Sequence, residues 1–480
     1  MSPRQSRREF LKKATVAAGA VAAIKVFGAP NVLADAKPNS KLGIAVVGTG
    51  GQGTGAHVPP AARERLIALV DADDKKLAAA LKKAEETEPN LKTSSVKTFN
   101  DYRKMFDAVG KDLDAILVAT PNHHHCLPAL LAMKLGKGAY VEKPMAYTVQ
   151  EARTMAEWSK KYKVATQMGN QGHSAEHYRR LCEYVWAGTI GKIAEVHCWS
   201  DRSNGGAGGR PPSKPVPAGF HWDEWIGPAP FREFHEGLHP HEWHGWYEFG
   251  DGSIGNMGCH VMDGAVWALK LQYPASIQIE EMGGGSEERY PTGCRIRYDF
   301  PAREDMPPVK VYWYDGKRKG IKSAEKGEFE DSVAKGAQNL PPLHLELEKK
   351  HGKTNYAGFG QSNGTLYVGE KGILFTGTYG SPFRMVPEEL HKATPVPPTK
   401  LPRLKGGHHG DFFSGVRGGQ LPCSNFEVAA VLTEIVLLGC LATRAGLGKK
   451  LEYDGPNLKF TNAPEFTKFL SRENRKGWEA

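Results

Sequence analysis

The chain of 480 residues is long enough for two to four domains with a large buried core. With 40% hydrophobic and 24% charged residues, its composition is ordinary for a soluble globular protein and excludes a long disordered acidic or basic tract. The formal net charge is +10, of which +4 lies in the first 36 residues, and the remaining basic residues form no stripe. We therefore expect no nucleic-acid partner.

The N-terminus has the pattern of an export signal. Arg7 and Arg8 precede Phe10-Leu11-Lys12, an apolar stretch covers residues 14–24, and small residues follow at Ala34 and Ala36. The apolar stretch is too short to span a bilayer, and no longer apolar run follows, so we expect no membrane span. The paired arginines resemble a twin-arginine signal, which implies that residues 1–36 direct a folded protein to the periplasm or otherwise out of the cytoplasm. The alternative is a basic amphipathic helix.

The cysteines agree with folding under reducing conditions before export. Their number is odd and none are spaced C-x-x-C, which predicts neither a disulfide framework nor a zinc knuckle. They are Cys126, Cys182, Cys198, Cys259, Cys294, Cys423 and Cys440.

A glycine-rich turn follows the first expected strand, residues 42–47. Its sequence is Gly48-Thr49-Gly50-Gly51-Gln52-Gly53, which is G-x-G-x-x-G. In a dinucleotide site the first glycine allows a tight turn, the second lets the backbone approach the pyrophosphate, and the third lets helix and strand pack closely. The N-terminus of the following helix would hold the phosphates.

An acidic residue at the end of the second expected strand, residues 66–70, extends this pattern. Asp71 can accept hydrogen bonds from both adenosine ribose hydroxyls and would repel a 2′-phosphate, so NAD is favoured over NADP. The alternative is that Asp71 caps the helix expected over residues 74–86, a role that Asp73 fills equally well.

Helices and strands then alternate, which predicts βαβ units and a parallel sheet. Helices are expected over residues 101–109, 124–136 and 148–162, and strands over 114–119, 138–141 and 164–168. Ligands of such sheets bind at the carboxyl ends of the strands. The polar residues at those ends are Thr120, Pro121, Asn122, His123, His124 and His125, then Glu142-Lys143-Pro144, then Gly169-Asn170-Gln171.

With these motifs the chain resembles the Gfo/Idh/MocA oxidoreductases. The likeness extends through residues 140–145 (Tyr-Val-Glu-Lys-Pro-Met), residues 252–263 with His260 and Asp263, and residues 473–478. It implies an α/β fold: a Rossmann domain over residues 41–166 and an α+β domain with an open, mostly antiparallel sheet over 167–450. A tail, residues 451–480, would pack on the body. In such proteins the open sheet commonly packs against another subunit, which implies a homo-oligomer.

The resemblance also implies roles for individual residues. It places Lys143, His260 and Asn256 at the nicotinamide as catalytic groups. With the glycine turn, the implied cofactor contacts are Gly48, Thr49, Gly50, Gln52, Gly53, Asp71, Thr120, Pro121, Asn122, His125, Glu142 and Lys143. Candidate substrate contacts are Asn170, Gln171, His244, Trp246 and Asp263.

These residue types suit the oxidation of an alcohol. An imidazole with its ordinary pKa of about 6.5 is a suitable base for the hydroxyl proton, which assigns that role to His260. An ammonium from Lys143 would stabilise the developing alkoxide, or relay the proton if its pKa falls beside a cationic nicotinamide. The alternatives are a structural pair between Lys143 and Glu142, and His260 as a core histidine.

Asn256 departs from the family pattern, in which an aspartate often stands at this position. An amide cannot take a proton, so a carboxylate relay is absent there. Asn256 would instead orient His260 or bind a substrate hydroxyl. Asp263, one helical turn after His260, would either orient the imidazole or only cap and pair.

Residues 201–250 are rich in glycine and proline at first and then in aromatic residues and histidines. Flat rings with polar neighbours suit sugars, although the same rings could form a small core under a long loop. His235, His239, His241 and His244 also allow a zinc site, but their spacing is irregular and we expect no metal.

Three functions fit these observations. The leading hypothesis is an NAD-dependent oxidoreductase acting on a sugar, glycoside or polyol hydroxyl. Because no dependable NAD pool exists outside the cytoplasm, its cofactor would be tightly bound. The first alternative is a redox-neutral NAD-dependent glycosidase, which oxidises, eliminates, hydrates and reduces in turn. The second is a non-catalytic sugar- or NAD-binding protein.

Overall fold

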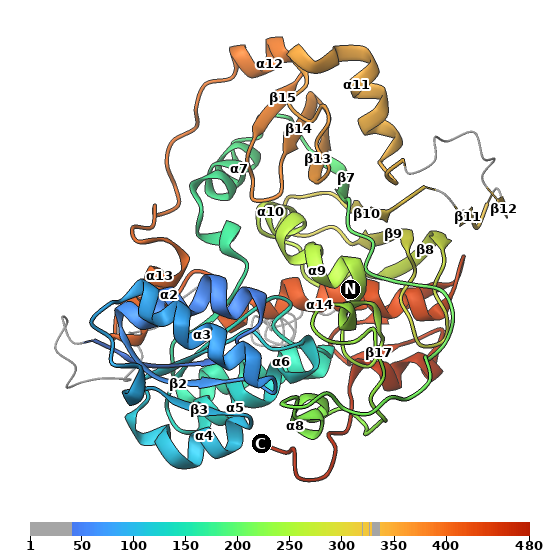
Figure 1. The fold of residues 1–480 in the computed structure, drawn as a ribbon. Helices are drawn as coiled ribbons and strands as arrows, with labels where there is room; N and C mark the ends of the chain where they lie inside the picture. The colour runs from blue at the N-terminus through green and yellow to red at the C-terminus, as the bar shows by residue number, and fades with distance from the viewer. Residues whose placement is uncertain (1–40, 319, 326, 329–336) are drawn as a thin grey trace, which may run out of the picture.

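The computed structural model describes residues 41–318, 320–325, 327–328 and 337–480 (Figure 1). The expected export signal, residues 1–36, lies outside these residues. The described chain forms two sheets, each with its own helices.

The first sheet has six strands in the order β3-β2-β1-β4-β5-β6, and all neighbours are parallel. The strands are β1 (Gly43–Val47), β2 (Arg65–Val70), β3 (Lys97–Phe99), β4 (Ala115–Val118), β5 (Gly138–Val141) and β6 (Thr166–Met168). Because β6 belongs to this sheet, the expected domain boundary at residue 166 falls inside a strand and moves past residue 168. The order is that of a Rossmann domain, as the sequence predicts.

The connecting helices begin where the sequence places capping residues. The side chain of Asp73 accepts a bond from the backbone of Lys75 at the start of α3, and Thr148 and Glu151 form a capping box on α6. Residues Asn122–His124 form a 3₁₀ turn, so the helix expected from residue 124 begins two residues later. The helices are α2 (Val58–Arg63), α3 (Asp74–Thr87), α4 (Tyr102–Val109), α5 (Cys126–Lys134) and α6 (Val149–Tyr162), with a π-helical turn η1 (Gly53–His57) before α2.

The second sheet has eleven described strands, with β12-β11-β8-β9-β10-β7-β13-β14-β15 as its main order and β16 pairing with β8 and β17. Among the described residues β7 and β10 are parallel and the other neighbours are antiparallel, so the sheet is mostly antiparallel as expected. The strands are β7 (Ile193–Ser200), β8 (Ser276–Gly283), β9 (Gly293–Phe300), β10 (Val309–Gly316), β11 (Ile321–Ser323), β12 (Gly327–Glu328), β13 (Gly364–Gly369), β14 (Gly372–Thr376), β15 (Phe383–Val386), β16 (Lys450–Asp454) and β17 (Lys459–Phe460).

Strands β8 and β9 alternate between buried and half-buried positions, so one face of the sheet enters the core. Ile279 and Ile296 pack inside, whereas Arg295 and Arg297 pair with Glu280 on the other face. This polar face is the one for which the resemblance implies a subunit contact, and that contact stays a prediction.

Helix α14 (Phe426–Ala445) packs against both parts of the protein, contacting α6, α9 and β8. It is the one helix of the described chain that is long and apolar enough to cross a membrane, yet 78% of its apolar window is buried inside the protein. It is therefore placed as a core helix. The other helices are α7 (Glu176–Trp186), α8 (Trp222–Ile226), α9 (Gly252–Val261), α10 (Asp263–Ala268), α11 (Pro342–Asn355), α12 (Glu388–Ala393) and α13 (Gly407–Val416).

Residues 201–250 form a mostly irregular segment with a small core of its own. Phe220, Trp222, Trp225, Phe234, Trp243, Trp246 and Phe249 belong to that core. The satellite-core interpretation thus holds for most of the aromatic rings.

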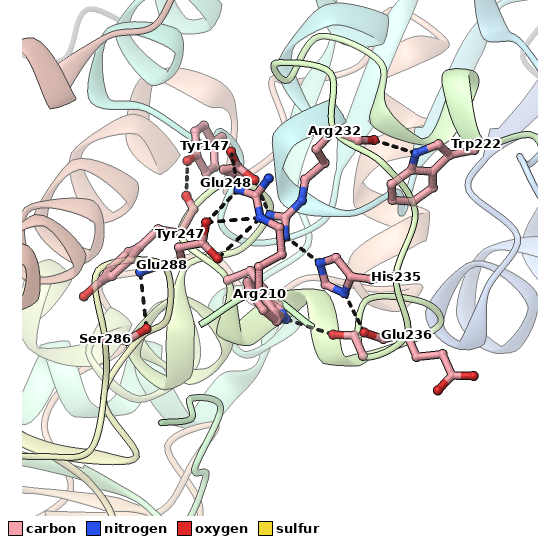
Figure 2. Close-up of polar contacts among 12 residues, drawn as sticks. Tyr147, Arg210, Trp222, Arg232, His235, Glu236, Tyr247, Glu248, Ser286 and Glu288 are labelled. Carbon is pink, nitrogen blue, oxygen red and sulfur yellow. Dashed lines mark hydrogen bonds and ion pairs between the residues drawn. The ribbon is translucent and has the colours of Figure 1, made fainter. Parts of the chain in front are cut away.

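Polar contacts fix this segment, as Figure 2 shows. The Trp222 indole donates to the backbone oxygen of Arg232 (2.8 Å), and the guanidinium of Arg232 contacts Glu248 and His235. Arg210 pairs with Glu288 at 2.6 Å, in the connection between β8 and β9. Charge-assisted bonds of this kind hold a segment that has little secondary structure.

Candidate active site

A cavity of about 480 Å³ opens where β1, β2, β4 and β5 end. Helix α9 and residues 239–244 close its other side. From the predicted cofactor and catalytic sets, the lining residues are Gly48, Gly50, Gln52, Asp71, Thr120, Pro121, Asn122, His125, Glu142, Lys143, Asn256 and His260.

The glycine turn has the geometry that a dinucleotide requires. Gly48 has a φ of +87°, and a Cβ atom there would lie 2.5 Å from the backbone of Ala119. A Cβ atom on Gly53 would lie 1.9 Å from the oxygen of Gly48, so this glycine serves close packing and does not line the cavity. Around Gly50 no heavy atom lies within 4 Å of the position of a Cβ, which leaves its backbone open to the cavity. These are the three roles of glycine in a nucleotide-binding turn.

Asp71 lies in the cavity wall and does not cap α3, since Asp73 does. Its Oδ2 accepts bonds from the backbone nitrogen (2.6 Å) and the hydroxyl (3.2 Å) of Thr49, and its Oδ1 accepts one from the nitrogen of Asp73 (3.0 Å). Thr49 itself is buried behind the wall. Burial raises the pKa of Asp71, although these hydrogen bonds act in the opposite direction. The carboxylate is thus fixed at the end of β2, where an adenosine ribose would lie.

Lys143 is held by Asn256. Its Nζ donates to the backbone oxygen (2.8 Å) and to the side-chain oxygen (3.2 Å) of that residue. The amide nitrogen of Asn256 donates to Asn204 at 3.0 Å, so Asn256 orients Lys143 and not His260. Burial lowers the pKa of Lys143, while the nearby charge of Glu142 acts against that shift.

Glu142 does not form the side-chain pair with Lys143 that sequence adjacency suggested. Its Oε1 lies 3.2 Å from Nε2 of His57 and accepts bonds from the amides of Gln52 (3.2 Å) and Gln171 (3.3 Å). Burial alone would raise the pKa of this carboxyl, but His57 and the other partners lower it to about 2. A Cβ atom on Gly169 would lie 2.5 Å from the carboxyl carbon, so a glycine is required behind it.

His260 lies on α9, buried, with its ring edge toward Tyr379 (5.2 Å between centroids). Burial, followed by the charge of Lys143, lowers its pKa to about 3, well below the ordinary value that sequence reasoning used. The imidazole is therefore neutral at physiological pH. Asp263 does not orient it: this carboxylate pairs with His173 (2.9 Å) and accepts a bond from Asn170 (3.0 Å). Of the roles expected for Asp263, the structure shows the pairing alone: Asp263 is the first residue of α10, and no side-chain bond from the described residues caps that helix.

Three buried polar atoms in the cavity wall have no hydrogen-bond partner within the described chain. They are Oγ1 of Thr120, Nδ1 of His244 and Nδ1 of His260. Because buried polar groups are normally paired, atoms of this kind fit a polar ligand in the cavity. Together with the open glycine turn, they fit a nicotinamide dinucleotide and a polar substrate.

Two of the predicted cofactor contacts, His125 and Asn122, hold the cavity wall in place through hydrogen bonds. His125 bridges two loops, with one ring nitrogen 2.7 Å from the oxygen of Pro144 and the other 2.8 Å from that of Thr120. Asn122 donates to the carboxyl of Asp251 at 2.6 Å. Asp251 stands at the N-terminus of α9 and is 1% exposed, and burial raises its pKa to about 8.

The predicted substrate residues divide into two groups. Gln171 and His244 line the cavity. Trp246 is enclosed in the satellite core, where its indole donates to Gly237 (2.8 Å), and Asn170 and Asp263 bond to each other behind the wall. These three do not line the cavity.

Sequence reasoning missed Arg202 and Tyr379, which line the wall, whereas His241 and Trp243 line it from the segment that was considered for sugars. Arg202 comes two residues after β7, so the rule that ligands bind beyond strand ends could have found it. Tyr379 lies in the turn between β14 and β15, and no local pattern marks it.

The histidines of residues 235–244 do not converge. His235 contacts Arg232 and the backbone of Glu236, and His239 bonds to Asp73 at 3.0 Å. Across the described residues, no group of three or more histidine, cysteine or acidic side chains is arranged to hold a metal ion.

The fold and the cavity define a dinucleotide-binding protein with a lysine and an imidazole at the far end of the cavity. Residues 42–170 match the oxidoreductase family with an NAD-binding Rossmann fold, and residues 197–296 match the C-terminal α/β domain of that family. Both of its domains thus match the domain models of the Gfo/Idh/MocA oxidoreductase family.

Individual relatives are more distant. The rhizopine catabolism protein MocA of Rhizobium meliloti is 25% identical over 240 residues, which cover 50% of this chain and 61% of that protein. The D-glucoside 3-dehydrogenase of Escherichia coli K12 is 27% identical over 158 residues, covering 33% and 43%. The alignments thus span less than two thirds of these curated relatives.

The fold is also similar to solved structures. The aldose-aldose oxidoreductase from Caulobacter crescentus, complexed with glycerol, superposes with a TM-score of 0.51 at 17% identity, over 86% of this chain and 100% of that one. At this identity the likeness supports the fold alone.

Proposed function

We propose that the protein is an NAD-dependent oxidoreductase that transfers a hydride between a tightly bound nicotinamide cofactor and a hydroxyl-bearing carbon of a sugar, glycoside or polyol. One observation carries the proposal: a single cavity joins the glycine turn and Asp71 to Lys143 and His260. The relative named D-glucoside 3-dehydrogenase supports a carbohydrate substrate.

The chemistry follows from the two basic groups. NAD, when bound, supplies the acceptor for the hydride that leaves the substrate carbon. Lys143, fixed by Asn256, holds its ammonium beside the substrate oxygen and stabilises negative charge there. The neutral His260 accepts the hydroxyl proton as the hydride leaves, because a pKa of about 3 makes it too weak a base to deprotonate the alcohol beforehand. The charge of Lys143 lowers the pKa of His260, so the pair holds one proton more readily than two.

The proposal is tested on the purified native protein. Mass spectrometry of the small molecules released on denaturation should detect NAD or NADH, and a panel of sugars and glycosides should change the NADH absorbance of the bound cofactor. Release of reducing sugar with no net change in absorbance would select the redox-neutral glycosidase instead. Cofactor binding without any exchange of hydride would select the binding protein.

The choice of NAD over NADP rests on Asp71. Its carboxylate suits two ribose hydroxyls and repels a 2′-phosphate. We expect wild type to bind NADH at least tenfold more tightly than NADPH, and Asp71→Ser to narrow the ratio by weakening NADH binding. Equal affinities for wild type would contradict the assignment.

We also propose export by the twin-arginine route, on the sequence of residues 1–36. Replacing Arg7 and Arg8 by lysine should leave the full-length protein in the cytoplasm, and an unchanged periplasmic fraction would contradict this. A homo-oligomer through the open sheet is proposed on the family resemblance alone, and light scattering of the purified protein tests it.

A further inference from the structure

Arg202 is a cation in the cavity wall with little to neutralise it. Among the described residues, its guanidinium forms one ion pair, at 4.0 Å to the adjacent Asp201, and its side chain is 58% exposed. Burial is the largest cause of the lowered pKa values of Lys143 and His244, and the charge of Arg202 lowers both further. Arg202 thus acts electrostatically on the end of the cavity where the substrate would lie.

Among the described residues, the acidic side chains of the same wall form no ion pair with Arg202, although the charge of Glu142 acts on Lys143. The acidic residues of the wall are Asp71, Glu142 and Glu224. Asp71 is bonded at the glycine turn, and Glu142 is bonded to His57 and two glutamines. Glu224 lies on α8, and His221, the residue before this helix, donates a backbone bond to the oxygen of Ala72. Because Ala72 follows Asp71, Glu224 lies toward the Asp71 end of the cavity.

An anionic ligand would resolve this charge imbalance. Arg202 carries a positive charge, the proposed ammonium of Lys143 lies in the same wall, and an oxidised nicotinamide would add a further positive charge. Like charges in a partly desolvated site repel, and a bound anion lowers that energy. A guanidinium is also the side chain best suited to a carboxylate or a phosphate, because it can donate two parallel hydrogen bonds.

We propose that Arg202 binds an anionic substituent of the substrate, so that the preferred substrate is an acidic sugar carrying a carboxylate or a phosphate. This inference rests on the proposed function and specifies the substrate class of the same site. Arg202 is a specificity residue in this scheme, whereas Lys143 and His260 act on the reacting carbon and oxygen.

Calorimetric binding to the NADH-loaded protein tests the proposal without turnover. The probes are methyl glucuronide, glucose 6-phosphate and the neutral methyl glucoside, with the same three ligands in the galacto and manno series. We expect at least one acidic probe to bind with at least about tenfold higher affinity than its neutral counterpart, because a hydrogen-bonded ion pair contributes about that much to binding. The stronger of the two acids identifies the anion as carboxylate or phosphate.

Variants locate the effect. Arg202→Gln should weaken the acidic probe about tenfold and change the neutral sugar less than twofold, while Arg202→Lys should retain part of the preference. Arg210→Gln is the matched control, because this arginine belongs to the same segment but pairs with Glu288 (Figure 2). It should leave the preference unchanged.

Several results would overturn the inference. Wild type could bind acidic and neutral probes with equal affinity, or bind no acidic probe. Arg202→Gln could lose the same affinity for acidic and neutral probes, or lose affinity for NADH alone. A different result would contradict the proposed function alone. If the protein bound an acidic sugar selectively through Arg202 but transferred no hydride with any sugar, it would not be an oxidoreductase, and the inferred ligand class would still hold.

Discussion

The Nζ atom of Lys143 lies 2.8 Å from the backbone oxygen of Asn256, and not against the carboxylate of its neighbour Glu142. Two uncharged oxygens therefore hold the only lysine of the described cavity wall. A neutral acceptor fixes the position of an ammonium without favouring its charge as a carboxylate would, so burial lowers the pKa of this lysine.

Lys143→Met removes the ammonium and keeps the shape of the side chain. We expect kcat for sugar oxidation to fall by about a thousandfold or more, since the charge that stabilises the oxygen is lost. The affinity for NADH should change by less than threefold, because the glycine turn and Asp71 are intact. Stopped-flow absorbance measures the first and fluorescence titration the second. Hydride transfer at the wild-type rate would remove Lys143 from the chemistry.

Asn256→Asp places a carboxylate 3.2 Å from Nζ and so favours the protonated lysine. An opposite charge at this distance shifts a pKa by about 1–3 units. The limb of the pH–rate profile that Lys143 governs should move to higher pH by that amount. Asn256→Ala is the control: it keeps the backbone oxygen, adds no charge, and should move the limb far less. Identical pH–rate profiles for Asn256→Asp and wild type would show that the protonation of Lys143 does not determine this limb of the profile.

The raised pKa of Asp251 predicts how the stability of the protein depends on pH. Its pKa is about 8 in the folded protein and 3.8 in a free side chain, so between these values the folded state holds a proton that the unfolded state releases. The stability associated with this carboxyl is present below pH 4 and is lost as the pH rises through 8.

In Asp251→Asn that pH dependence is removed, while the amide oxygen can still accept the bond from Asn122. The variant should be more stable than wild type at pH 8.5, by on the order of 6 kcal/mol in the free energy of unfolding, and about equal at pH 4. Urea unfolding at both pH values measures this. A variant that is no more stable than wild type at pH 8.5 would show that the pKa of Asp251 is not raised in the folded protein.

The Rossmann half was predictable because its signals are local. Buried strands, glycines with special backbone requirements and capping side chains such as Asp73 and Thr148 lie within a few residues of the elements that they define. The positions of β5 and α3 accordingly agree with the predicted ranges to within one residue. The resemblance supplied the second domain, whose strand order depends on contacts between distant segments.

Adjacency in sequence misled at two places in the site. Glu142 and Lys143 follow one strand, where successive side chains point in opposite directions, so Glu142 faces His57 while Lys143 faces Asn256. His260 and Asp263 are three residues apart, but α9 ends at Val261 and α10 begins at Asp263, so they do not share a helix face. Tyr379 reaches the cavity from the distant turn between β14 and β15, which no local pattern encodes.

The last prediction concerns the end of the chain, whose Trp478 is 2% exposed. Its ring lies under the guanidinium of Arg103 (3.6 Å to the centroid) and edge-on to Tyr102 and His124, both at 5.7 Å between centroids. Tyr102 and His124 also line the cavity, so the tail supports the wall near Asp71.

Trp478→Ala should therefore lower the free energy of unfolding by about 3 kcal/mol, as expected for a buried tryptophan, and should also weaken NADH binding severalfold because the wall loses its support. Trp478→Phe, which keeps an aromatic ring in place, should retain most of both properties. Chemical denaturation and NADH fluorescence titration measure the two effects on the same samples. If Trp478→Ala lost stability but bound NADH as wild type does, the tail would stabilise the fold without shaping the cavity. If both stability and NADH affinity were unchanged, the packing of Trp478 on Tyr102 would contribute nothing in solution.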